Sequence, residues 1–340
     1  MDSNKKVGII GAGSFGTALA MVLANKGHQV TLWARDFMQI SYMEKNLENK
    51  HYLPDVKLPK TIEFTSDLEI AVSGKDYLVF AVPAQSFRGV FEKSCQYFDS
   101  SVPVINVAKG IEKGTMMRLS EVAEKIRPDV RYAALSGPSH AEEVGRGLPT
   151  TLVVGAKKKA TAEYIQNIFM GDVLRVYTSP DVKGIELGGA LKNVVALAAG
   201  IAAGLGYGDN TMAALITRGI AEITQIGLAL GCQYETFAGL TGIGDLIVTC
   251  ASKHSRNRRA GMLIGQGYTM DEAMAEVKMI VEGVYSAKAG MELANKYHLE
   301  VPIIQQVNEI LFENKSASEA VNDLMFRDKK VENSKLKWED

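Results

Sequence analysis

The sequence predicts an α/β protein in which a doubly wound, mostly parallel sheet is followed by an all-α C-terminal domain. Three observations predict this fold class. An apolar run ends in a glycine motif, strand-like and helix-like segments then alternate up to about residue 155, and helical patterns alone follow from about residue 181. We place a nucleotide-binding domain at 1–180, a helical domain at 181–328, and a charged tail at 329–340.

The first element is the apolar run 7–10, which leads directly into Gly11, Gly13 and Gly16 and then into a helical pattern over 17–25. Gly11 allows a tight turn, Gly13 lets the backbone approach a pyrophosphate, and Gly16 lets helix and strand pack closely. The helix N-terminus offers unpaired N–H groups and a partial positive charge to phosphates. This context predicts a Rossmann-like dinucleotide site, with a phosphate-free turn as the alternative.

A second strand over 29–34 is followed by Arg35 and Asp36. An acidic residue at this place accepts hydrogen bonds from the adenosine ribose of NAD, whereas an arginine holds the 2′-phosphate of NADP. Because Arg35 comes first, we expect NADP(H) to be preferred and NAD(H) to be accepted. The alternative is that Arg35 is a solvated loop residue.

The remainder of the first half alternates between short apolar runs and helical patterns. Residues 37–60 look helical and then loop-like, and 68–72 and 86–98 predict helices. The run 76–83 is nearly all apolar, which is typical of a strand buried on both faces of a parallel sheet. Further strands are predicted by three runs: 103–108, 131–135 and 150–155.

The sequence pattern changes near residue 180 from alternating strands and helices to helices. There Asp181 follows a proline and provides a helix N-cap signal. Helical patterns then extend to about residue 327, separated by glycine-rich segments at 204–208 and 239–245. The predicted helices cover 183–204, 211–230, 255–265, 270–276, 284–297 and 303–313.

Bulk composition excludes several function classes. The formal net charge is −1, so nothing favours binding to nucleic acid or to an anionic membrane. The three cysteines, Cys95, Cys232 and Cys250, match neither a metal site nor a disulfide framework, which indicates a reducing cytoplasm. Residues 1–6 do not resemble a signal peptide, and the apolar run 194–206 is too short to span a bilayer.

Lys192 is the most informative candidate for chemistry, because it lies in a helical pattern otherwise made of small and apolar residues. Partial desolvation would lower its pKa toward that of a usable base, and a second cation such as Lys109 would lower it further. Asp245 would orient the ammonium group but oppose the shift. The alternative is a lysine whose stem covers the core while its head reaches water.

The segment 255–259 contains a serine, three arginines and an asparagine, and it suits an anion. If Ser255 caps a helix, the first-turn N–H groups and Arg256 would bind a phosphate. The alternative is a solvated basic face. We discount His140 as a catalytic residue, because a histidine beside Glu142 and Glu143 is more often a helix-terminal residue.

With these residues assembled, the chain resembles the bacterial type of NAD(P)-dependent glycerol-3-phosphate dehydrogenase. Six segments carry the resemblance, and Phe15 is a mild departure because tryptophan is common there. The segments are 11–20, 106–110, 136–142, 191–194, 239–246 and 255–258.

The resemblance implies interconversion of dihydroxyacetone phosphate and sn-glycerol 3-phosphate, which supplies the backbone of phospholipids. It implies that Lys192 exchanges the C2 hydroxyl proton, that Lys109 polarises the same oxygen, and that Asp245 holds Lys192. The implied substrate contacts are Lys109, Gly137, Ser139, Lys192, Asn193, Asp245, Ser255, Arg256 and Asn257. The implied dinucleotide contacts are Gly11, Gly13, Ser14, Phe15, Gly16, Arg35, Lys109, Ala141, Arg256, Ile280 and Glu282.

Two other functions stay open on the sequence. One is a related dehydrogenase of the β-hydroxyacid type, whose substrate carries a carboxylate in place of the phosphate. The other is a non-catalytic NADP sensor, which would need neither a buried lysine nor an anion site in its second half. The apolar helical half also leads us to expect a homodimer.

Overall fold

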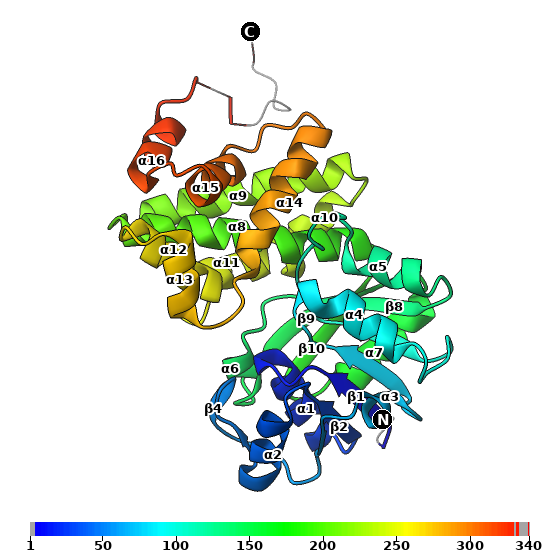
Figure 1. The fold of residues 1–340 in the computed structure, drawn as a ribbon. Coiled ribbons are helices and arrows are strands. Elements are labelled where there is room, and N and C mark those ends of the chain that lie inside the picture. The colour runs from blue at the N-terminus through cyan, green and yellow to red at the C-terminus, as the bar shows by residue number, and fades with distance from the viewer. Residues whose placement is uncertain (1–3, 330, 333–338, 340) are drawn as a thin grey trace.

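The computed structural model describes residues 4–329, 331, 332 and 339, so most of the predicted tail at 329–340 lies outside the described residues. Two lobes lie one above the other in Figure 1. The lower lobe contains the main sheet and the upper lobe is helical. This arrangement confirms the predicted fold class. The assignment of residues 1–180 and 181–328 to separate domains remains a prediction.

The lower lobe is built on an eight-stranded sheet in the order β10-β9-β8-β7-β6-β1-β2-β5. Every neighbouring pair is parallel except β8 and β9, which are antiparallel. The strands are β1 (Lys6–Ile10), β2 (Gln29–Trp33), β5 (Glu63–Thr65), β6 (Tyr77–Phe80), β7 (Pro103–Asn106), β8 (Arg131–Ser136), β9 (Thr150–Ala156) and β10 (Leu174–Ser179).

Helices cover both faces of this sheet, which explains why its central strands are apolar along their whole length. All four residues of β6 are buried, and so are Val7, Ile9 and Ile10 of β1. The helices of this lobe are α1 (Ser14–Asn25), α2 (Phe37–Asn46), α3 (Leu68–Val72), α4 (Ala84–Ser94), α5 (Leu119–Ile126), α6 (Ala141–Val144) and α7 (Lys159–Phe169).

The upper lobe is organised around α8 (Val182–Gly204), whose N-terminus is capped by the carboxylate of Asp181 as the sequence predicts. Of the described helices, α8 alone has the length and composition to cross a membrane, yet 83% of its most apolar window is buried inside the fold. The other elements are α9 (Asp209–Ala229), α10 (Tyr234–Phe237), η1 (Leu240–Gly244), α11 (Asp245–Ala251), α12 (Arg256–Gly265), α13 (Met270–Val277), α14 (Glu282–Lys296), α15 (Pro302–Phe312) and α16 (Ala317–Met325).

Two pairs of glycines bring α8 and α12 into backbone contact. A Cβ added to Gly200 or Gly204 of α8 would lie 2.1 or 2.2 Å from a carbonyl oxygen of α12. A Cβ added to Gly261 or Gly265 of α12 would likewise lie 2.2 Å from a carbonyl oxygen of α8. The spacing between these helices is therefore set by the absence of side chains.

Several elements were not predicted. The two-residue β3 (Glu48–Asn49) pairs antiparallel with β4 (Leu53–Lys57) inside the segment 37–60 that was expected to end as a loop. The segment 239–245, expected as a glycine-rich loop, winds into the π-helical turn η1 and the start of α11. This tight winding needs Gly242, where a Cβ would lie 1.9 Å from the carbonyl oxygen of Phe237.

We expect Gly261→Ala to lower the free energy of unfolding by about 2 kcal/mol, because the new methyl group forces the packed backbones of α8 and α12 apart. Urea unfolding monitored by circular dichroism measures the change. The matched control is Gly89→Ala in α4, where nothing lies within 4 Å of the added Cβ and helix propensity should raise stability slightly. Equal effects of the two variants would contradict the packing argument.

Candidate active site

The site lies where the carboxyl ends of the lower-lobe strands meet the upper lobe, as expected for an open parallel sheet. Lys109 follows β7 by three residues, and the segment containing Gly137 and Ser139 follows β8. The upper lobe contributes Lys192 from the middle of α8 and Asp245 from the first position of α11. Residues more than a hundred positions apart therefore converge at one place.

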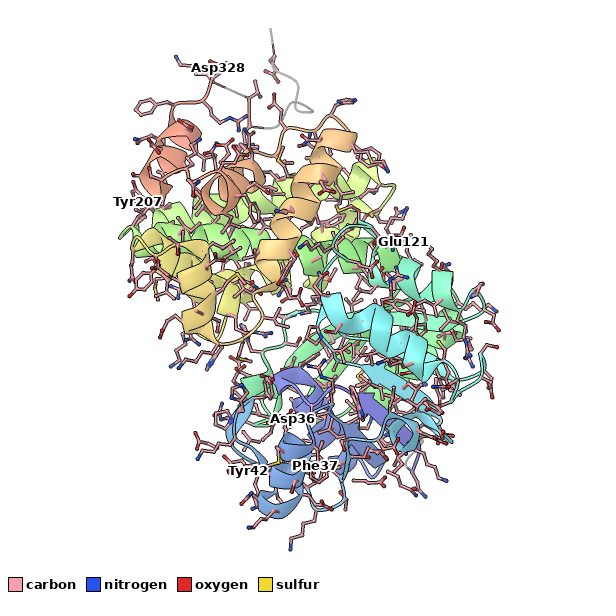
Figure 2. All side chains as sticks on the ribbon, viewed as in Figure 1. Asp36, Phe37, Tyr42, Glu121, Tyr207 and Asp328 are labelled. Carbon is pink, nitrogen blue, oxygen red and sulfur yellow. The ribbon has the colours of Figure 1, made fainter. Side chains whose placement is uncertain are left out.

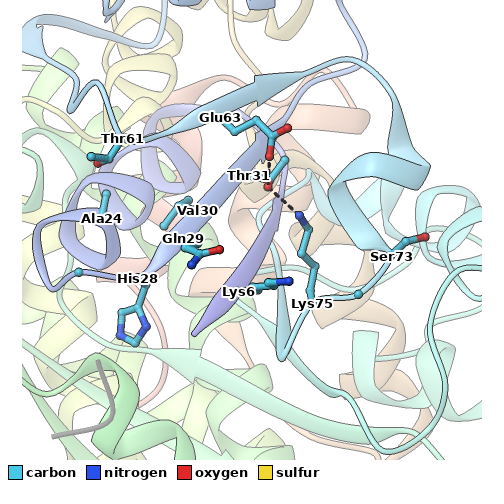
Figure 3. A pocket seen from close by; sticks show the side chains of 12 residues that line it. Lys6, Ala24, His28, Gln29, Val30, Thr31, Thr61, Glu63, Ser73 and Lys75 are labelled. Carbon is cyan, nitrogen blue, oxygen red and sulfur yellow. Dashed lines mark hydrogen bonds between the residues drawn. The ribbon is translucent and has the colours of Figure 1, made fainter. Parts of the chain in front are cut away.

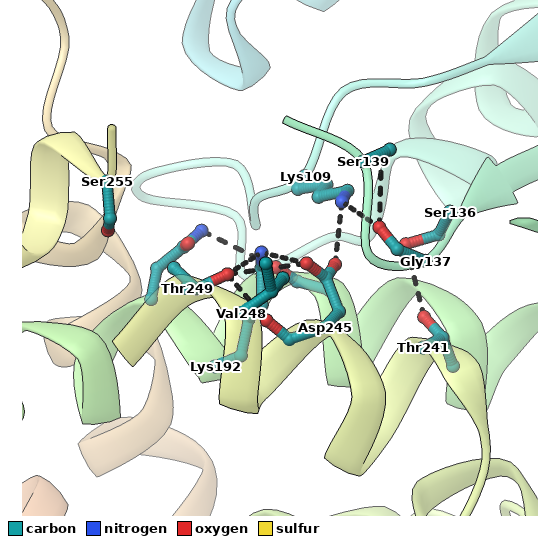
Figure 4. A network of polar contacts seen from close by, with 12 residues as sticks. Lys109, Ser136, Gly137, Ser139, Lys192, Thr241, Asp245, Val248, Thr249 and Ser255 are labelled. Carbon is teal, nitrogen blue, oxygen red and sulfur yellow. Dashed lines mark hydrogen bonds and ion pairs between the residues drawn. The ribbon is translucent and has the colours of Figure 1, made fainter. Parts of the chain in front are cut away.

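The centre of the site is the carboxylate of Asp245, which accepts a hydrogen bond from a lysine of each lobe (Figure 4). Lys109 Nζ lies 2.6 Å from Asp245 Oδ2, and Lys192 Nζ lies 2.5 Å from Oδ1. Lys109 also donates to the carbonyl oxygen of Gly137 at 3.0 Å. The structure thus brings together Lys109, Gly137, Lys192 and Asp245.

Burial and charge set the protonation of this cluster. The residue Lys192 is only 6% exposed, and this burial, opposed by Asp245 and aided by Lys109, lowers its pKa to about 8. Burial of the Asp245 carboxyl disfavours its ionised form, but the two ammonium groups outweigh that effect and hold its pKa below its ordinary value. The site therefore pairs an ionised carboxylate with a lysine that titrates not far above neutrality.

Thr249 is a further member of the cluster. The Lys192 ammonium donates to Thr249 Oγ1 at 2.6 Å, and this hydroxyl donates to the backbone carbonyl of Asp245 at 2.6 Å. No role is predicted for Thr249 from the sequence. The sequence feature that could have identified it is its spacing of four residues from Asp245, because this spacing places both side chains on one face of α11.

The predicted anion-binding segment forms the start of α12, and Ser255 caps that helix as expected. Ser255 Oγ accepts from the backbone N–H of Arg258 at 3.2 Å. Asn257 is buried, donates to Asn193 Oδ1 at 2.9 Å and accepts from the N–H of Gly283 at 2.9 Å, so it joins α8, α12 and α14. Arg256 is exposed beside them.

The glycine turn after β1 has the shape that a pyrophosphate needs. Gly11 has a φ of +123°, and a Cβ there would lie 2.7 Å from the backbone of Ala81. A Cβ on Gly16 would lie 2.0 Å from the carbonyl oxygen of Gly11, whereas one on Gly13 would meet nothing within 4 Å. Gly13 is also the N-cap of α1 and leaves the first-turn N–H groups free of a side-chain cap. Ser14 and Phe15 are half-buried beside this open space.

The two candidates that follow β2 have different environments. The carboxylate of Asp36 is the N-cap of α2 and accepts from the N–H of Met38 at 2.9 Å. Arg35 is exposed next to it in the chain. Phe37 is 66% exposed and lies near Asp36 in the lower lobe (Figure 2). The guanidinium of Arg35 is thus accessible to a ligand at the carboxyl end of β2.

The other predicted contacts lie along the seam between the lobes. Ala141 begins α6, and His140 is its N-cap, as the sequence analysis expected. Glu282 begins α14, and its Oε1 accepts from the N–H of Ala84 at the start of α4, 3.0 Å away. Ile280 is 40% exposed just before Glu282. Among the described residues, none of these forms a hydrogen bond or an ion pair with Lys109 or Lys192.

A buried polar cluster that the sequence does not predict holds α8 against the lower lobe. Glu186, six positions before Lys192, accepts from Arg118 Nη1 at 2.8 Å, from Ser120 N at 2.8 Å and from Tyr132 OH at 2.6 Å. Because Glu186 and Lys192 belong to one rigid helix, this anchor also determines where the lysine lies.

A hollow of about 560 Å³ lies at the opposite, amino-terminal edge of β1 and β2 (Figure 3). None of the predicted site residues lines it. Three of its polar side chains are paired with one another, since Lys75 donates to Thr31 Oγ1 and Thr31 donates to Glu63 Oε2, each at 2.7 Å. The convergence of candidate residues therefore favours the site between the lobes.

Comparison with known proteins gives matches over nearly the whole chain. Residues 6–162 match the NAD-dependent glycerol-3-phosphate dehydrogenase N-terminus, and residues 181–322 match the C-terminus of the same family. A glycerol-3-phosphate dehydrogenase [NAD(P)+] of Agathobacter rectalis is 58% identical over 333 residues, which cover 98% of this chain and 99% of that protein.

Two further similarities agree with these matches. The enzyme of the same name from Fusobacterium nucleatum is 55% identical and covers 96% of this chain and 98% of that protein. The crystal structure of glycerol-3-phosphate dehydrogenase from Coxiella burnetii superposes with a TM-score of 0.92 at 36% identity, covering 95% of this chain and 99% of that chain.

We expect Asp245→Asn to lower the free energy of unfolding by about 3 kcal/mol, because it leaves two ammonium groups close together without their shared carboxylate. Chemical unfolding without ligand provides the measurement, and Asp172→Asn on an exposed turn is the control. An unchanged midpoint would mean that the two lysines are not charged in the folded protein.

Proposed function

Because the chain belongs to the NAD-dependent glycerol-3-phosphate dehydrogenase family, we propose that Lys192, Lys109 and Asp245 form its catalytic centre. The protein is an NAD(P)+-dependent oxidoreductase acting on a CH–OH group, and it interconverts dihydroxyacetone phosphate and sn-glycerol 3-phosphate. The observation that carries the residue assignment is the pair of lysines, one from each lobe, on the single buried carboxylate of Asp245.

Lys192 is the proton carrier in this proposal. Its neutral amine takes the proton of the C2 hydroxyl during oxidation, and its ammonium returns a proton to that oxygen during reduction. A pKa of about 8 leaves both forms accessible near neutral pH. Lys109 donates to the same oxygen and stabilises the negative charge that develops there, while Asp245 and Thr249 hold the lysine in place.

The start of α12 is the proposed phosphate site. Arg256 and the first-turn N–H groups bind the phosphate, with Ser255 and Asn257 alongside, because a helix N-terminus combines free donors with a partial positive charge. Asn193 orients Asn257 through the 2.9 Å hydrogen bond between their amides. Gly137 and Ser139 complete the pocket on the side of Lys109.

The glycine turn and the seam between the lobes are the proposed place of the dinucleotide. Gly11, Gly13, Ser14, Phe15 and Gly16 would hold the pyrophosphate. Further contacts would come from Arg35, Lys109, Ala141, Arg256, Ile280 and Glu282. When bound, the nicotinamide supplies or accepts the hydride at C2. The protein would align the substrate carbon with the cofactor between the two lobes.

Finer features of the function are also proposals. We propose that NADP(H) is preferred over NAD(H), because Arg35 is exposed after β2. We propose that the protein works in the cytoplasm as a homodimer and supplies glycerol phosphate for phospholipid synthesis. We keep the division into domains at residue 180, where Ser179 ends the last strand and Val182 begins α8.

The central test compares NADPH consumption with dihydroxyacetone phosphate and with unphosphorylated dihydroxyacetone. We expect the first to be used and kcat/KM for the second to fall by at least about 1,000-fold, since the charge-assisted contacts to phosphate are lost. Running each substrate with NADH as well gives the coenzyme preference. Similar rates for the two substrates would contradict the assignment of a phosphate site at α12.

Replacing the proposed base should separate chemistry from binding. We expect Lys192→Met to lower kcat by about 1,000-fold while the Kd of NADPH stays within about twofold, because only the proton carrier is removed. In the unsubstituted protein, reduction should slow and oxidation should quicken as the pH rises through about 8. The matched control is Lys183→Met, at another lysine of α8. Activity that survives in Lys192→Met would assign the proton transfer to another group.

Arg35 should distinguish the two coenzymes. We expect Arg35→Ala to raise the Kd of NADPH by about 10-fold or more and that of NADH by less than about twofold, because only NADPH has the 2′-phosphate. Titration of protein fluorescence gives both constants, and Lys45→Ala in the last turn of α2 is the control. Parallel losses for both coenzymes would show that Arg35 does not contact the 2′-phosphate.

A further inference from the structure

We propose that Asn49 is a positioning residue for the cofactor. Its buried side-chain amide holds the peptide between Ala12 and Gly13 in the one orientation that directs the Gly13 N–H toward the pyrophosphate. This inference rests on the proposed function of the glycine turn as the pyrophosphate site. It concerns a residue of the short β3, which lies outside the glycine motif and outside every contact proposed above.

The geometry is a clamp on one carbonyl oxygen. Asn49 is 1% exposed, and its Nδ2 donates to the carbonyl oxygen of Ala12 at 2.9 Å and to Thr17 Oγ1 at 2.8 Å. Gln39 Nε2, from α2, donates to the same Ala12 oxygen at 2.7 Å. Two side-chain amides from outside the motif therefore converge on the middle of the glycine turn.

Holding this carbonyl also orients the neighbouring N–H. The described peptide bonds are all trans, and in a planar trans peptide the C=O and N–H groups point in opposite directions. With the Ala12 oxygen directed at Asn49 and Gln39, the Gly13 N–H is directed away from them. The clamp thus aims a donor, while the Asn49 amide stays buried and the Gln39 side chain is half-buried.

The clamp is needed because glycine does not prevent the opposite orientation. Turning the peptide over would carry Gly13 from its φ of −76° to a positive φ, which glycine adopts readily. The flipped peptide would present the partial negative charge of a carbonyl oxygen where the phosphates bind. Gly13 therefore lets a phosphate approach but would also let the loop adopt the wrong orientation. The amides of Asn49 and Gln39 prevent that rotation.

Asn49 also ties the loop to the helix that follows it. Thr17 is fully buried in the first turn of α1, and its N–H donates to the carbonyl oxygen of Gly13 at 3.0 Å. Because one amide group contacts both Ala12 and Thr17, the loop and the helix N-terminus are held as one unit. Both sets of donors then face the same ligand.

The test uses the full-length Asn49→Asp variant, which keeps the side chain's size but replaces the donor by an oxygen that repels the Ala12 carbonyl. We expect the Kd of NADPH and the Kd of NADH to rise alike, by about 10-fold or more, in calorimetric titrations without substrate. Binding of adenosine 2′-monophosphate, which lacks the pyrophosphate, should be unchanged. The backbone amide signal of Gly13 in ¹⁵N spectra should move in the ligand-free protein.

The matched control is Asn46→Asp, whose amide donates only to the carbonyl oxygen of Tyr42 at the end of α2. It should leave all three affinities unchanged. Gln39→Ala is a second variant that removes the other half of the clamp, and it should weaken both dinucleotides without weakening adenosine 2′-monophosphate. It keeps the proposal testable if Asn49→Asp folds poorly.

Two results would overturn the proposal. One is an unchanged dinucleotide affinity in both variants, and the other is an equal loss for the dinucleotides and adenosine 2′-monophosphate, which indicates general loosening of the lobe. Failure of the proposed function looks different, because the unsubstituted protein would then bind neither dinucleotide, or would turn over both substrates alike.

Discussion

The structure depends on one shared charge, the buried carboxylate of Asp245. Two ammonium groups so close to each other would repel strongly in a dry interior, and the carboxylate between them makes their approach possible. Lys109 comes from the lower lobe, whereas Lys192 and Asp245 come from the upper lobe. The proposed catalytic cluster is therefore complete only when the lobes are packed together, and assembling it also draws them together.

Elements with strong local signals could be predicted from the sequence. The glycine turn between an apolar run and a helix, the cap at Asp181 and the cap at Ser255 each involve residues within a few positions of one another. The apolar surroundings of Lys192 along α8 likewise predicted its burial and its lowered pKa. In these cases the physical cause is contained in a short stretch of chain.

Features that depend on long-range contacts could not be predicted. Nothing near Glu186 shows that it accepts hydrogen bonds from Arg118 and Tyr132, and nothing near Asn49 shows that its amide reaches the glycine turn. The edge strand β5 is three residues long, which is too short for an alternation of apolar and polar residues to be recognised. The segment 239–245 was misassigned because its glycines, usual in loops, here permit a tightly wound turn against Phe237.

The crossing of α8 and α12 has a consequence for selectivity. Lys192 lies on one of these helices and the proposed phosphate site begins the other, while the glycines at their contact determine how far apart the axes stand. The distance between Lys192 and the proposed phosphate site is therefore determined by glycines that belong to neither proposed site. Under the proposed assignment, adapting the enzyme to a longer sugar phosphate would call for bulkier residues at that crossing, with Lys109, Lys192 and Asp245 left unaltered.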